Sequence, residues 1–444
     1  MVKDLDYIRE HTSGKLFPGS DGTRVIDGIV SDSRAAGEGK LFLGLRGEKI
    51  NGNSFAGSAV AAGGCALVDD EEFFGKNCVL VGDVRKALLD LASYYRRNEV
   101  ANVRFVGVTG SVGKTTTKDM IACALASEKR VHKTSGNANS QVGLPTTVID
   151  TSPEDDFAVV ELGMSYPGEM ERIARAAMPD ISVVTNIGHS HIENLGSREA
   201  IRDEKLKIAS ASPEGSVLLL NGDEPLLRDI DKNGKRVFYL STNDNGCDCF
   251  ATDISSGREG TVFTAHIFGK TQEVSLNVIG AHFILNALFA LAVCELSGVS
   301  LQKAASALNG YKSDGRRQFI YESRGHTVIS DCYNAAPESV SASLSVLGGM
   351  KGRRIAVLGD MLELGERSPE YHAGLGSAIN KNADVLITYG ELARHYADNV
   401  SVETHFFKPG DPERLKNFLN GFIKPGDIVL YKASNGMKLF DCIV

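Results

Sequence analysis

The sequence has no excess of basic residues. Its 48 lysines and arginines are outnumbered by 56 aspartates and glutamates, so the formal net charge at pH 7 is −8. A surface that neutralises a nucleic-acid backbone needs clustered lysine and arginine. We therefore expect no nucleic-acid partner, and we expect anionic ligands to bind at local positive sites.

The sequence also lacks an apolar run long enough to cross a membrane. Its most apolar stretch, residues 283–299, contains Asn286 and Glu295 and is typical of a buried helix. The first ten residues mix charges into the place where a secretory signal would need an apolar core. We therefore expect a cytoplasmic protein with no membrane partner.

Cysteine motifs for metal binding are absent. The eight cysteines form no Cys-x-x-Cys pair and no zinc-finger spacing. They are expected to be reduced and mostly buried small residues. Cys247 and Cys249 are the one close pair, in a turn-forming context that leaves a metal site there as a minor alternative.

The length of 444 residues indicates several domains, since domains usually run about 100–200 residues. Up to about residue 80 the apolar runs are short, as in a small α/β domain. An amphipathic helix is predicted next, and then two successive series of strands and helices typical of parallel sheets. An alternating stretch at 250–278 predicts an antiparallel excursion in the first series. The sequence therefore predicts an α/β fold of three domains, at residues 1–82, 83–313 and 314–444.

A phosphate-binding loop is predicted at Thr109-Gly-Ser-Val-Gly-Lys-Thr-Thr-Thr117, between an apolar strand and a helix. Phosphate binding needs converging backbone N–H groups, a helix N-terminus and a cation, which Gly110, Gly113 and Lys114 supply. Thr115 places a hydroxyl where such loops hold Mg²⁺, with Thr116 and Thr117 as alternatives. The strict Walker motif fails, because Val108 replaces its first glycine. We expect the phosphates to bind at Thr109, Gly110, Ser111, Val112, Gly113, Lys114, Thr115 and Thr116.

Five segments in order resemble the Mur ligase family. They are the loop at 109–117, the segment at 133–145, Glu161-Leu-Gly-Met164, the segment at 185–197, and Asp331-Cys-Tyr-Asn-Ala-Ala-Pro337 with Val357-Leu-Gly-Asp-Met-Leu-Glu-Leu-Gly365. The resemblance implies a small N-terminal domain for a UDP-sugar, a central P-loop ATPase and a C-terminal Rossmann-like domain. It implies a ligase that activates a carboxylate as an acyl phosphate and releases ADP and phosphate.

Within the family, these motifs are most similar to the member that joins D-Ala-D-Ala to UDP-MurNAc-tripeptide in peptidoglycan precursor synthesis. The third residue of the tripeptide, lysine or diaminopimelate, stays open, and a monomer is expected. One alternative is a sibling ligase that adds a single amino acid, or a folylpolyglutamate synthase. Another is a P-loop regulatory subunit that has lost the ligase chemistry.

The resemblance also implies the catalytic groups. Glu161, at the end of an apolar strand, suits Mg²⁺. The matching register favours His191 over His189 as a metal-associated histidine, and Lys205 over Lys207 as a lysine carried as an N-carbamate. Two Mg²⁺ ions are expected, with Thr115, Glu161, His191 and carbamylated Lys205 as ligands. The expected catalytic residues are Lys114, Glu161, His191, Lys205 and Arg316.

The remaining contacts implied are with ATP and the UDP-sugar. Asn286 matches an adenine-contacting asparagine, Asp331 a ribose-contacting acid, and Arg316 an arginine that reaches the nucleotide phosphates across a domain junction. The residues expected at the UDP-sugar substrate are Ser33, Arg34, Gly47, Asn137, Asn139 and Ser140. The chain departs from the family pattern at Asn51-Gly-Asn53, Ala336 and Ala433.

Overall fold

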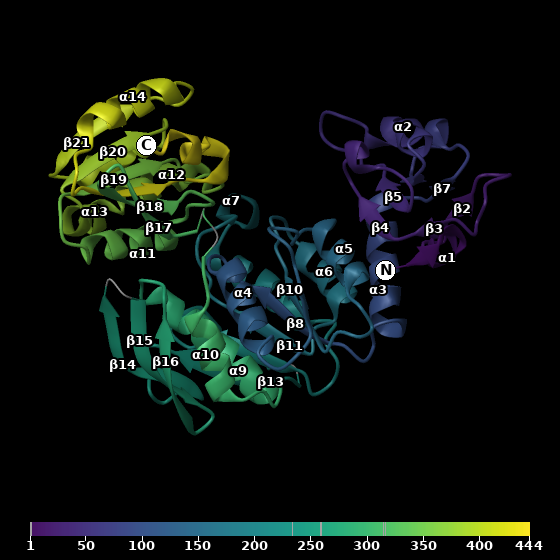
Figure 1. Ribbon diagram of the computed structural model, residues 1–444, viewed down its shortest axis with the longest axis horizontal. Helices are drawn as coiled ribbons and strands as arrows, with labels where there is room; N and C mark the ends of the chain where they lie inside the picture. Colours follow the sequence, from purple (N-terminus) through teal and green to yellow (C-terminus); the bar gives the residue numbers. More distant parts are fainter. Residues whose placement is uncertain (1, 233, 258–259, 314, 316) are drawn as a thin grey trace.

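The computed structural model describes residues 2–232, 234–257, 260–313, 315 and 317–444. Within this part of the chain the strands form one sheet for each predicted domain, plus a two-stranded pair near the N-terminus. The N-terminal and C-terminal domains stand apart above the central domain, on opposite sides of it (Figure 1). The predicted α/β class is confirmed, while the exact domain boundaries stay a prediction.

The N-terminal domain has a mostly parallel sheet with the strand order β2-β7-β6-β5-β4. Its strands are β1 (Lys3–Asp4), β2 (Lys15–Leu16), β3 (Val25–Ile26), β4 (Gly28–Val30), β5 (Lys40–Leu43), β6 (Cys65–Val68) and β7 (Cys78–Leu80). Its helices are α1 (Leu5–His11) and α2 (Ala56–Ala61).

The central domain is built on a sheet of order β16-β15-β14-β13-β12-β11-β8-β10-β9. The strands are β8 (Arg104–Thr109), β9 (Val131–Lys133), β10 (Phe157–Glu161), β11 (Ile181–Val184), β12 (Val217–Asn221), β13 (Arg236–Ser241), β14 (Cys249–Gly257), β15 (Gly260–Ile267) and β16 (Lys270–Leu276). The helices are α3 (Val84–Asn98), α4 (Lys114–Leu125), α5 (Gly143–Asp150), α6 (Glu169–Ala177), α7 (Ile192–Leu195), α8 (Arg198–Leu206), α9 (His282–Leu296) and α10 (Leu301–Asn309).

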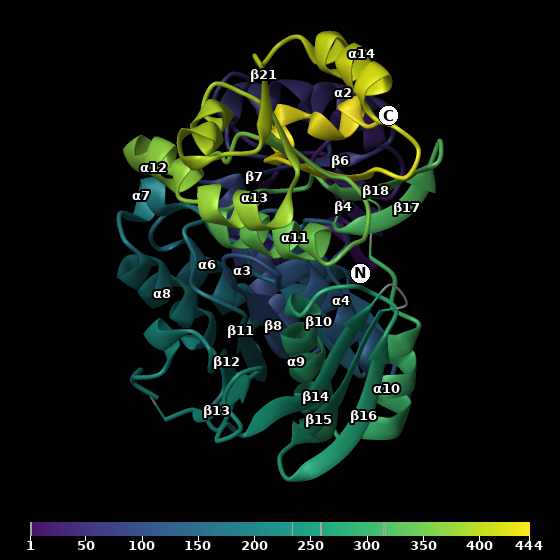
Figure 2. The same ribbon diagram turned by 90° about the vertical axis from the view of Figure 1, so that its left-hand side faces the viewer.

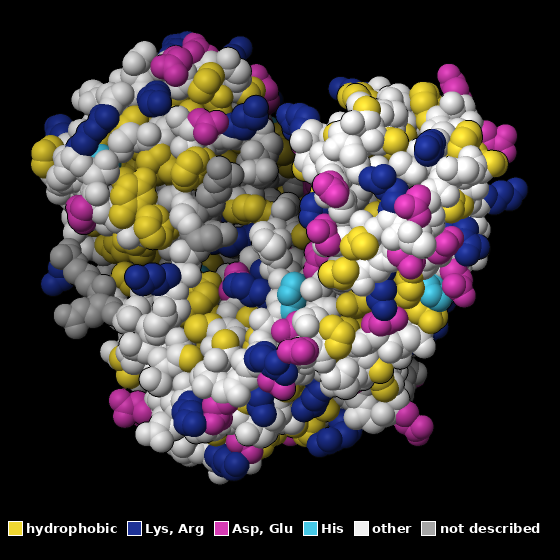
Figure 3. Space-filling view, turned by 45° about the vertical axis from the view of Figure 1, so that its right-hand side comes forward, with side chains coloured by type: hydrophobic (Ala, Val, Ile, Leu, Met, Phe, Trp, Pro, Cys, Tyr) yellow, Lys and Arg dark blue, Asp and Glu magenta, His cyan; other side chains and the backbone are white. Residues whose placement is uncertain are grey.

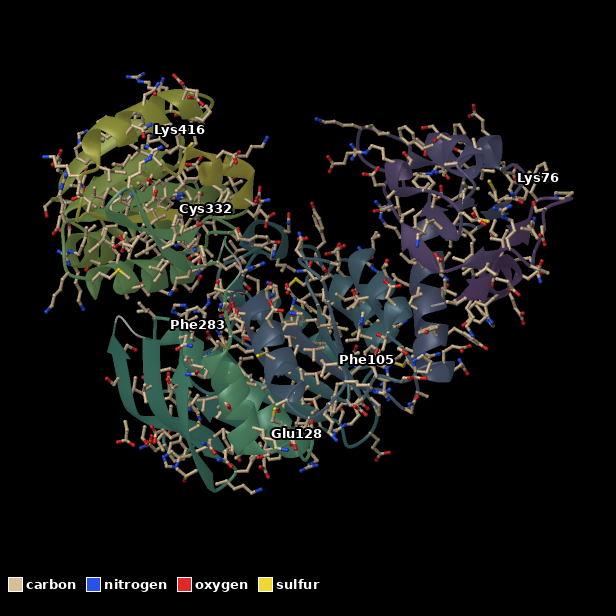
Figure 4. All side chains as sticks on the ribbon, viewed as in Figure 1. Lys76, Phe105, Glu128, Phe283, Cys332 and Lys416 are labelled. Carbon is tan, nitrogen blue, oxygen red and sulfur yellow. The ribbon has the colours of Figure 1, made fainter. Side chains whose placement is uncertain are left out.

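Both faces of the central sheet are covered, which explains the apolar runs of its strands. Phe105 of β8, labelled in Figure 4, points into a core shared with α3, α5 and α6. Its neighbour Val106 points the opposite way, into a core shared with α4, α9 and α10. Because parallel strands are buried on both faces, they lose the polar alternation of an exposed sheet. The predicted antiparallel excursion is confirmed as β14, β15 and β16.

The C-terminal domain has the strand order β17-β18-β22-β19-β20-β21, parallel except for the edge strand β17. Its strands are β17 (Phe319–Ser323), β18 (His326–Asp331), β19 (Arg354–Gly359), β20 (Val385–Tyr389), β21 (Glu403–Phe407) and β22 (Ile428–Lys432). Its helices are α11 (Pro337–Gly348), α12 (Ser368–Ala373), α13 (Gly376–Asn382) and α14 (Pro412–Phe422). Helices lie on both faces, as the predicted Rossmann-like domain requires.

The central and C-terminal domains meet along a packed junction. Helix α7 of the central domain lies beside α12 of the C-terminal domain (Figure 2), and Ile192 of α7 packs against the C-terminal core. Figure 4 labels Phe283 at the start of α9 and Cys332 just after β18, on the two sides of this junction. The carboxyl ends of both parallel sheets therefore come close to each other.

The fold bears on two features expected from the composition, namely the state of the cysteines and the absence of a long apolar helix. All eight cysteines are free, and all but the half-buried Cys123 are buried, as predicted. A search of the described residues finds no helix with the length and apolar character needed to traverse a bilayer.

Candidate active site

The predicted phosphate loop connects β8 to α4. Gly113 has a φ of +80° and precedes the first turn of α4, and Gly110 has a φ of +153°. A Cβ at Gly110 would collide with the hydroxyl of Thr185, so this position needs glycine for conformation and for space. The loop thus leads directly into a helix N-terminus, which is a favourable place for an anion.

A neighbouring segment after β11 holds the loop in shape. The side-chain oxygen of Asn186 accepts hydrogen bonds from the backbone N–H groups of Ser111 (3.1 Å) and Val112 (3.0 Å). The hydroxyl of Ser111 in turn accepts a bond of 2.8 Å from the N–H of Gly188. Asn186 lies in the segment at 185–197, in which the sequence assigned a role only to the histidines. Its role in holding the phosphate loop was not predicted.

Lys114 is folded back over the loop. Its Nζ donates to the carbonyl oxygen of Gly110 at 2.8 Å. Burial lowers the pKa of Lys114, an effect that the negative charges of Glu161 and Glu363 oppose. An ammonium group poised over converging N–H groups is the arrangement that a nucleotide phosphate requires.

Thr115 and Glu161 form a pair of oxygen ligands next to the loop. Thr115 Oγ1 donates to Glu161 Oε2 at 2.7 Å, and Asn139 Nδ2 donates to Glu161 Oε1 at 2.7 Å. In the described part of the chain no three His, Cys, Asp or Glu side chains gather as a metal cluster. Mg²⁺ in nucleotide enzymes is often held by one or two protein oxygens together with phosphates and water. This pair therefore fits a Mg²⁺ that arrives with ATP.

A cavity of about 980 Å³ lies between the central and C-terminal domains. One wall carries the phosphate loop, Glu161, His191 and Asn286, and the other carries Arg317, Asp331, Tyr333 and Lys432. The predicted substrate residues Asn137, Asn139 and Ser140 also line it. The two walls bring together residues that are more than 200 positions apart in the sequence.

The two predicted nucleoside contacts come from different domains, and both line this cavity. Asn286 is buried in α9 and accepts a hydrogen bond of 2.9 Å from Thr117 through its Oδ1, at the start of α4. Asp331 ends β18 and is held by the buried Lys432, whose Nζ lies 2.7 Å from its carboxylate, and by the hydroxyl of Ser343. The pairing role of Lys432 was not predicted, because β22 is 100 residues away from β18 in the chain.

The predicted phosphate-contacting arginine, Arg316, lies outside the described residues. The next residue, Arg317, lines the cavity, and its guanidinium stacks 3.6 Å from the ring centre of Tyr333. Its positive charge adds to the lowering of the pKa of Lys114. The wall of the cavity formed by the C-terminal domain therefore carries a positive charge at Arg317.

The two histidines of the segment at 185–197 both contact carboxylates of the C-terminal domain. His189 Nδ1 lies 2.5 Å from Glu338 Oε1, at the start of α11. His191 Nδ1 lies 2.6 Å from Glu363 Oε2, in an approach that is not aligned as a hydrogen bond. Of these two histidines, His191 lines the cavity, and its association with a metal stays a prediction.

Known proteins similar to this chain identify its family. The Mur ligase middle domain model matches residues 108–294, and the Mur ligase glutamate ligase domain model matches residues 315–435. A UDP-N-acetylmuramoyl-tripeptide–D-alanyl-D-alanine ligase of Bacillus subtilis is 36% identical over all of this chain and 98% of its own length. The chain belongs to the Mur ligase family.

Solved structures of Mur ligases extend the likeness to three dimensions. A structure of MurF from Acinetobacter baumannii superposes with a TM-score of 0.90 at 26% identity, over 100% of this chain and 98% of that one. MurF of Thermotoga maritima in complex with ADP gives a TM-score of 0.84 at 28% identity, over 94% and 96%. This Mur ligase therefore shares the three-domain architecture of MurF, and its phosphate loop serves an ATP-dependent ligase.

Three lysines of the ligase are buried, and Lys205 differs from the other two. Lys118 donates to the carbonyl oxygen of Thr134 at 2.7 Å, and Lys432 pairs with Asp331. Lys205, on α8, is 1% exposed, and no hydrogen bond or salt bridge of its Nζ is recorded within the described residues. Burial and the positive charge of Lys114 place its pKa well below the usual lysine value. Lys205 therefore gives up its proton more readily than an exposed lysine does.

The residues predicted to bind uridine lie on the N-terminal domain of the ligase. An open hollow separates this domain from the C-terminal domain (Figure 3). Ser33 and Arg34 occupy an exposed turn in which Arg34 pairs with Asp32 at 2.6 Å. Gly47 follows Arg46, whose carbonyl oxygen accepts a bond of 2.9 Å from Arg85. Because Arg85 lines the cavity, this loop is connected to the edge of the site.

The departure at Asn51-Gly-Asn53 has a structural role. Asn53 is fully buried, donates to Asp69 Oδ1 at 2.8 Å and accepts from the N–H of Asp69 at 3.0 Å. Asn51 accepts hydrogen bonds from the backbone N–H and the side chain of Asn53. These two amides shape the loop that carries Gly47.

Proposed function

We propose that this Mur ligase joins D-Ala-D-Ala to the free carboxylate of UDP-MurNAc-tripeptide, with ATP converted to ADP and phosphate. The relative in Bacillus subtilis that carries this name matches the chain over its full length. The observation that carries the proposal is the cavity in which a phosphate loop, a strand-end carboxylate and the C-terminal domain face one another.

The chain's own groups suit acyl-phosphate chemistry. The loop N–H groups and Lys114 are placed to bind the nucleotide phosphates and to stabilise charge on the transferred γ-phosphate. When bound, Mg²⁺ would supply positive charge that lowers the repulsion between the two anions that react. Thr115 and Glu161 would hold it, since their oxygens already meet at 2.7 Å. The carbonyl carbon of the resulting acyl phosphate is then open to attack by the amine.

Closure of the two walls would exclude water from this intermediate. Arg317, Tyr333 and Asp331 face the phosphate loop from the other domain, so bound ATP would contact both domains. An acyl phosphate hydrolyses readily, and closure around it protects it from water. The contacts of Glu338 with His189 and of Glu363 with His191 join the same two domains.

We also propose that Lys205 carries a carbamate. A neutral amine can attack CO₂, forming an N–C bond and releasing a proton, which turns the lysine into a carboxylate-like group. The burial of the Lys205 amine, its lack of a hydrogen-bond partner among the residues that the structure describes, and its lowered pKa support this choice. Lys207, the alternative, is committed to a salt bridge of 2.7 Å with Glu204. The resulting anion would lie within range of the charge of Lys114 and could serve a second Mg²⁺.

The UDP-sugar is proposed to extend from Asn137, Asn139 and Ser140 toward the N-terminal domain. Asn139 contacts Glu161, so this loop would bring the free carboxylate of the tripeptide next to the phosphate site. Gln141, which follows Ser140, donates a hydrogen bond of 2.9 Å to Glu169 of α6. The loop is therefore anchored to the central domain at the place where a substrate would cross between domains.

The test is phosphate release measured with each component left out in turn. We expect release to require ATP, Mg²⁺, UDP-MurNAc-tripeptide and D-Ala-D-Ala together. Release that persists without the dipeptide, or that responds to a single amino acid instead, would overturn the assignment in favour of an ATPase or a sibling ligase. Tripeptides ending in lysine and in diaminopimelate, compared side by side, identify the third residue.

A further inference from the structure

The loop after β19 places one carboxylate, that of Glu363, at the domain junction. The carboxyl end of a parallel strand is where open α/β sheets bind ligands. Glu363 has a φ of +63°, a region that residues other than glycine seldom adopt and that is enriched at functional sites. This motif, Gly359-Asp-Met-Leu-Glu-Leu-Gly365, has no role in the ATP chemistry described above.

Among the junction carboxylates of the described residues, Glu363 and Glu338 each pair with one histidine, and Glu363 is the more exposed of the two. Glu161 accepts two hydrogen bonds, Asp331 is held by Lys432 and Ser343, and Glu338 is bonded to His189. In the described residues, the contact recorded for the Glu363 carboxylate is with His191, at 2.6 Å and without hydrogen-bond alignment. The Glu363 side chain is 54% exposed, whereas that of His191 is 17% exposed. One side of this carboxylate is therefore open to a ligand.

The position of Glu363 suits a cationic ligand that must approach the phosphate site. It contacts His191, which lines the cavity, and its negative charge opposes the lowering of the pKa of Lys114. The carboxylate thus acts across the junction from the C-terminal side, opposite the wall that binds the phosphates. Glu363 is not among the residues that line the cavity, so a cation held on its carboxylate would lie beside the cavity, next to His191.

We propose that Glu363 binds the ammonium group of the incoming D-Ala-D-Ala and directs its nitrogen toward the acyl phosphate. The inference rests on the proposed function, since it requires D-Ala-D-Ala to be the amine substrate. The ammonium and the carboxylate form a charge-assisted hydrogen bond of the strong kind. Glu363 is therefore a recognition and positioning residue. The bound ammonium loses a proton to water before its nitrogen attacks the carbonyl carbon, and the C–N bond forms as the C–O bond to the departing phosphate breaks.

The residue beside Glu363 fits the rest of such a ligand. Leu362 is 40% exposed, so its apolar side chain is accessible at the domain junction. Its backbone N–H donates to Ser434 Oγ at 3.0 Å, which ties the loop to the turn after β22. Leu362 would offer an apolar contact to the methyl group next to the ammonium. The loop is held by the fold, so this surface exists before the ligand binds.

The competing role for Glu363 is to orient His191 as a metal-site residue. The two roles differ in which substrate depends on the carboxylate. A purely orienting role would raise the Mg²⁺ concentration needed for activity and would affect all substrates alike. Ammonium recognition would affect the dipeptide alone.

The experiment compares Glu363→Gln, Glu363→Asp and the control Glu366→Gln, an exposed carboxylate on the same loop. We expect Glu363→Gln to raise the KM for D-Ala-D-Ala at least 10-fold, with the KM for ATP and the Mg²⁺ half-saturation within about two-fold of wild type. Glu363→Asp should recover part of the loss, and Glu366→Gln should behave as wild type. An unchanged dipeptide KM, or a parallel rise in the Mg²⁺ requirement, would overturn the proposal.

A second measurement uses propionyl-D-Ala, a dipeptide analogue without the amino group, as a competitive inhibitor. Its inhibition constant should be the same in wild type and Glu363→Gln, because it lacks the group that Glu363 binds. A weaker inhibition in the variant would contradict ammonium recognition. A failure of the proposed function can be told apart from a failure of this inference. In the former case the wild-type ligase would release no phosphate in response to D-Ala-D-Ala.

Discussion

Thr115 Oγ1 donates a 2.7 Å hydrogen bond to Glu161 Oε2, which joins the first turn of α4 to the end of β10. Strands β8 and β10 are parallel neighbours, and Glu161 lies opposite Val108 in their register. The strand that leads into the phosphate loop and the strand that ends in a carboxylate therefore finish at the same edge. The two oxygens are in place before metal and nucleotide bind.

Replacing Glu161 with Gln should make the ligase depend on higher Mg²⁺. The amide keeps the shape of the side chain and removes the charge that suits a hard cation. We expect kcat to fall about 100-fold, the size of loss typical for one electrostatic group in an active site. A Mg²⁺ titration of phosphate release measures it, with Glu154→Gln, an exposed carboxylate, as control. Equal Mg²⁺ curves for Glu161→Gln and wild type would exclude Glu161 as a ligand.

Lys114→Met should remove the cation that faces the γ-phosphate. Methionine preserves most of the chain length, so the loss reports on the ammonium group. We expect phosphate release to drop at least about 100-fold, since the charge on the transferred phosphoryl group is no longer stabilised. Lys76→Met, at an exposed site on the N-terminal domain (Figure 4), is the matched control. Activity above one tenth of wild type would show that Lys114 is not needed for the transfer.

Lys205→Ala should abolish turnover, while the neighbouring Lys207→Ala should change it little. The Lys205 carbamate would supply an anion that alanine cannot, whereas the Lys207 side chain pairs with Glu204. Addition of a short-chain carboxylic acid should partly restore activity to Lys205→Ala by occupying the vacated space. Mass spectrometry at neutral pH with ¹³C-bicarbonate checks the modification directly. Full activity of Lys205→Ala would remove this lysine from the mechanism.

Gly188→Ala should interfere with the junction of the two domains. A Cβ at Gly188 would lie 2.8 Å from the Glu338 carboxylate, closer than atoms can approach without a shift. We expect a lower kcat/KM for ATP, because ATP would contact both walls. The double variant Gly188→Ala/Glu338→Ala should be no worse than Glu338→Ala alone, since the collision is gone. Gly57→Ala, where a Cβ meets nothing, is the control; additive losses in the double variant would contradict the clash.

Asn53→Ala should destabilise the N-terminal domain by about 1–3 kcal/mol, because buried polar partners lose their hydrogen bonds. Asp69 is the partner affected, through both its carboxylate and its backbone N–H. Urea denaturation measures the change in the free energy of unfolding, with the exposed Asn98→Ala as control. A loss no larger than that of the control would show that the amide network is not needed for this fold.

The local parts of the site could be predicted from the sequence. The phosphate loop is a continuous strand–loop–helix segment, and Glu161 ends a strand whose apolar run marks a parallel sheet. Their physical signals lie within a few residues of each other. The structure places them next to one another because β8 and β10 are neighbours.

Partners that meet only through folding could not be predicted in the same way. Lys432 pairs with Asp331 because β22 lies beside β18, and Glu338 meets His189 because two domains come together. Nothing in the sequence near Lys432 or Glu338 indicates its partner. The distinction of Lys205 from Lys207 also depends on burial, since both occupy the same charged stretch.

The cavity between the two sheets has consequences for inhibitor design. A compound that contacted only the phosphate loop would meet a shape shared by many unrelated nucleotide enzymes, so it would discriminate poorly among them. One that also stacked against Tyr333 and reached Asp331 would act as a wedge between the domains. Such a compound would hold the central and C-terminal domains at one fixed separation. Its selectivity would come from the distance between the two walls of the cavity.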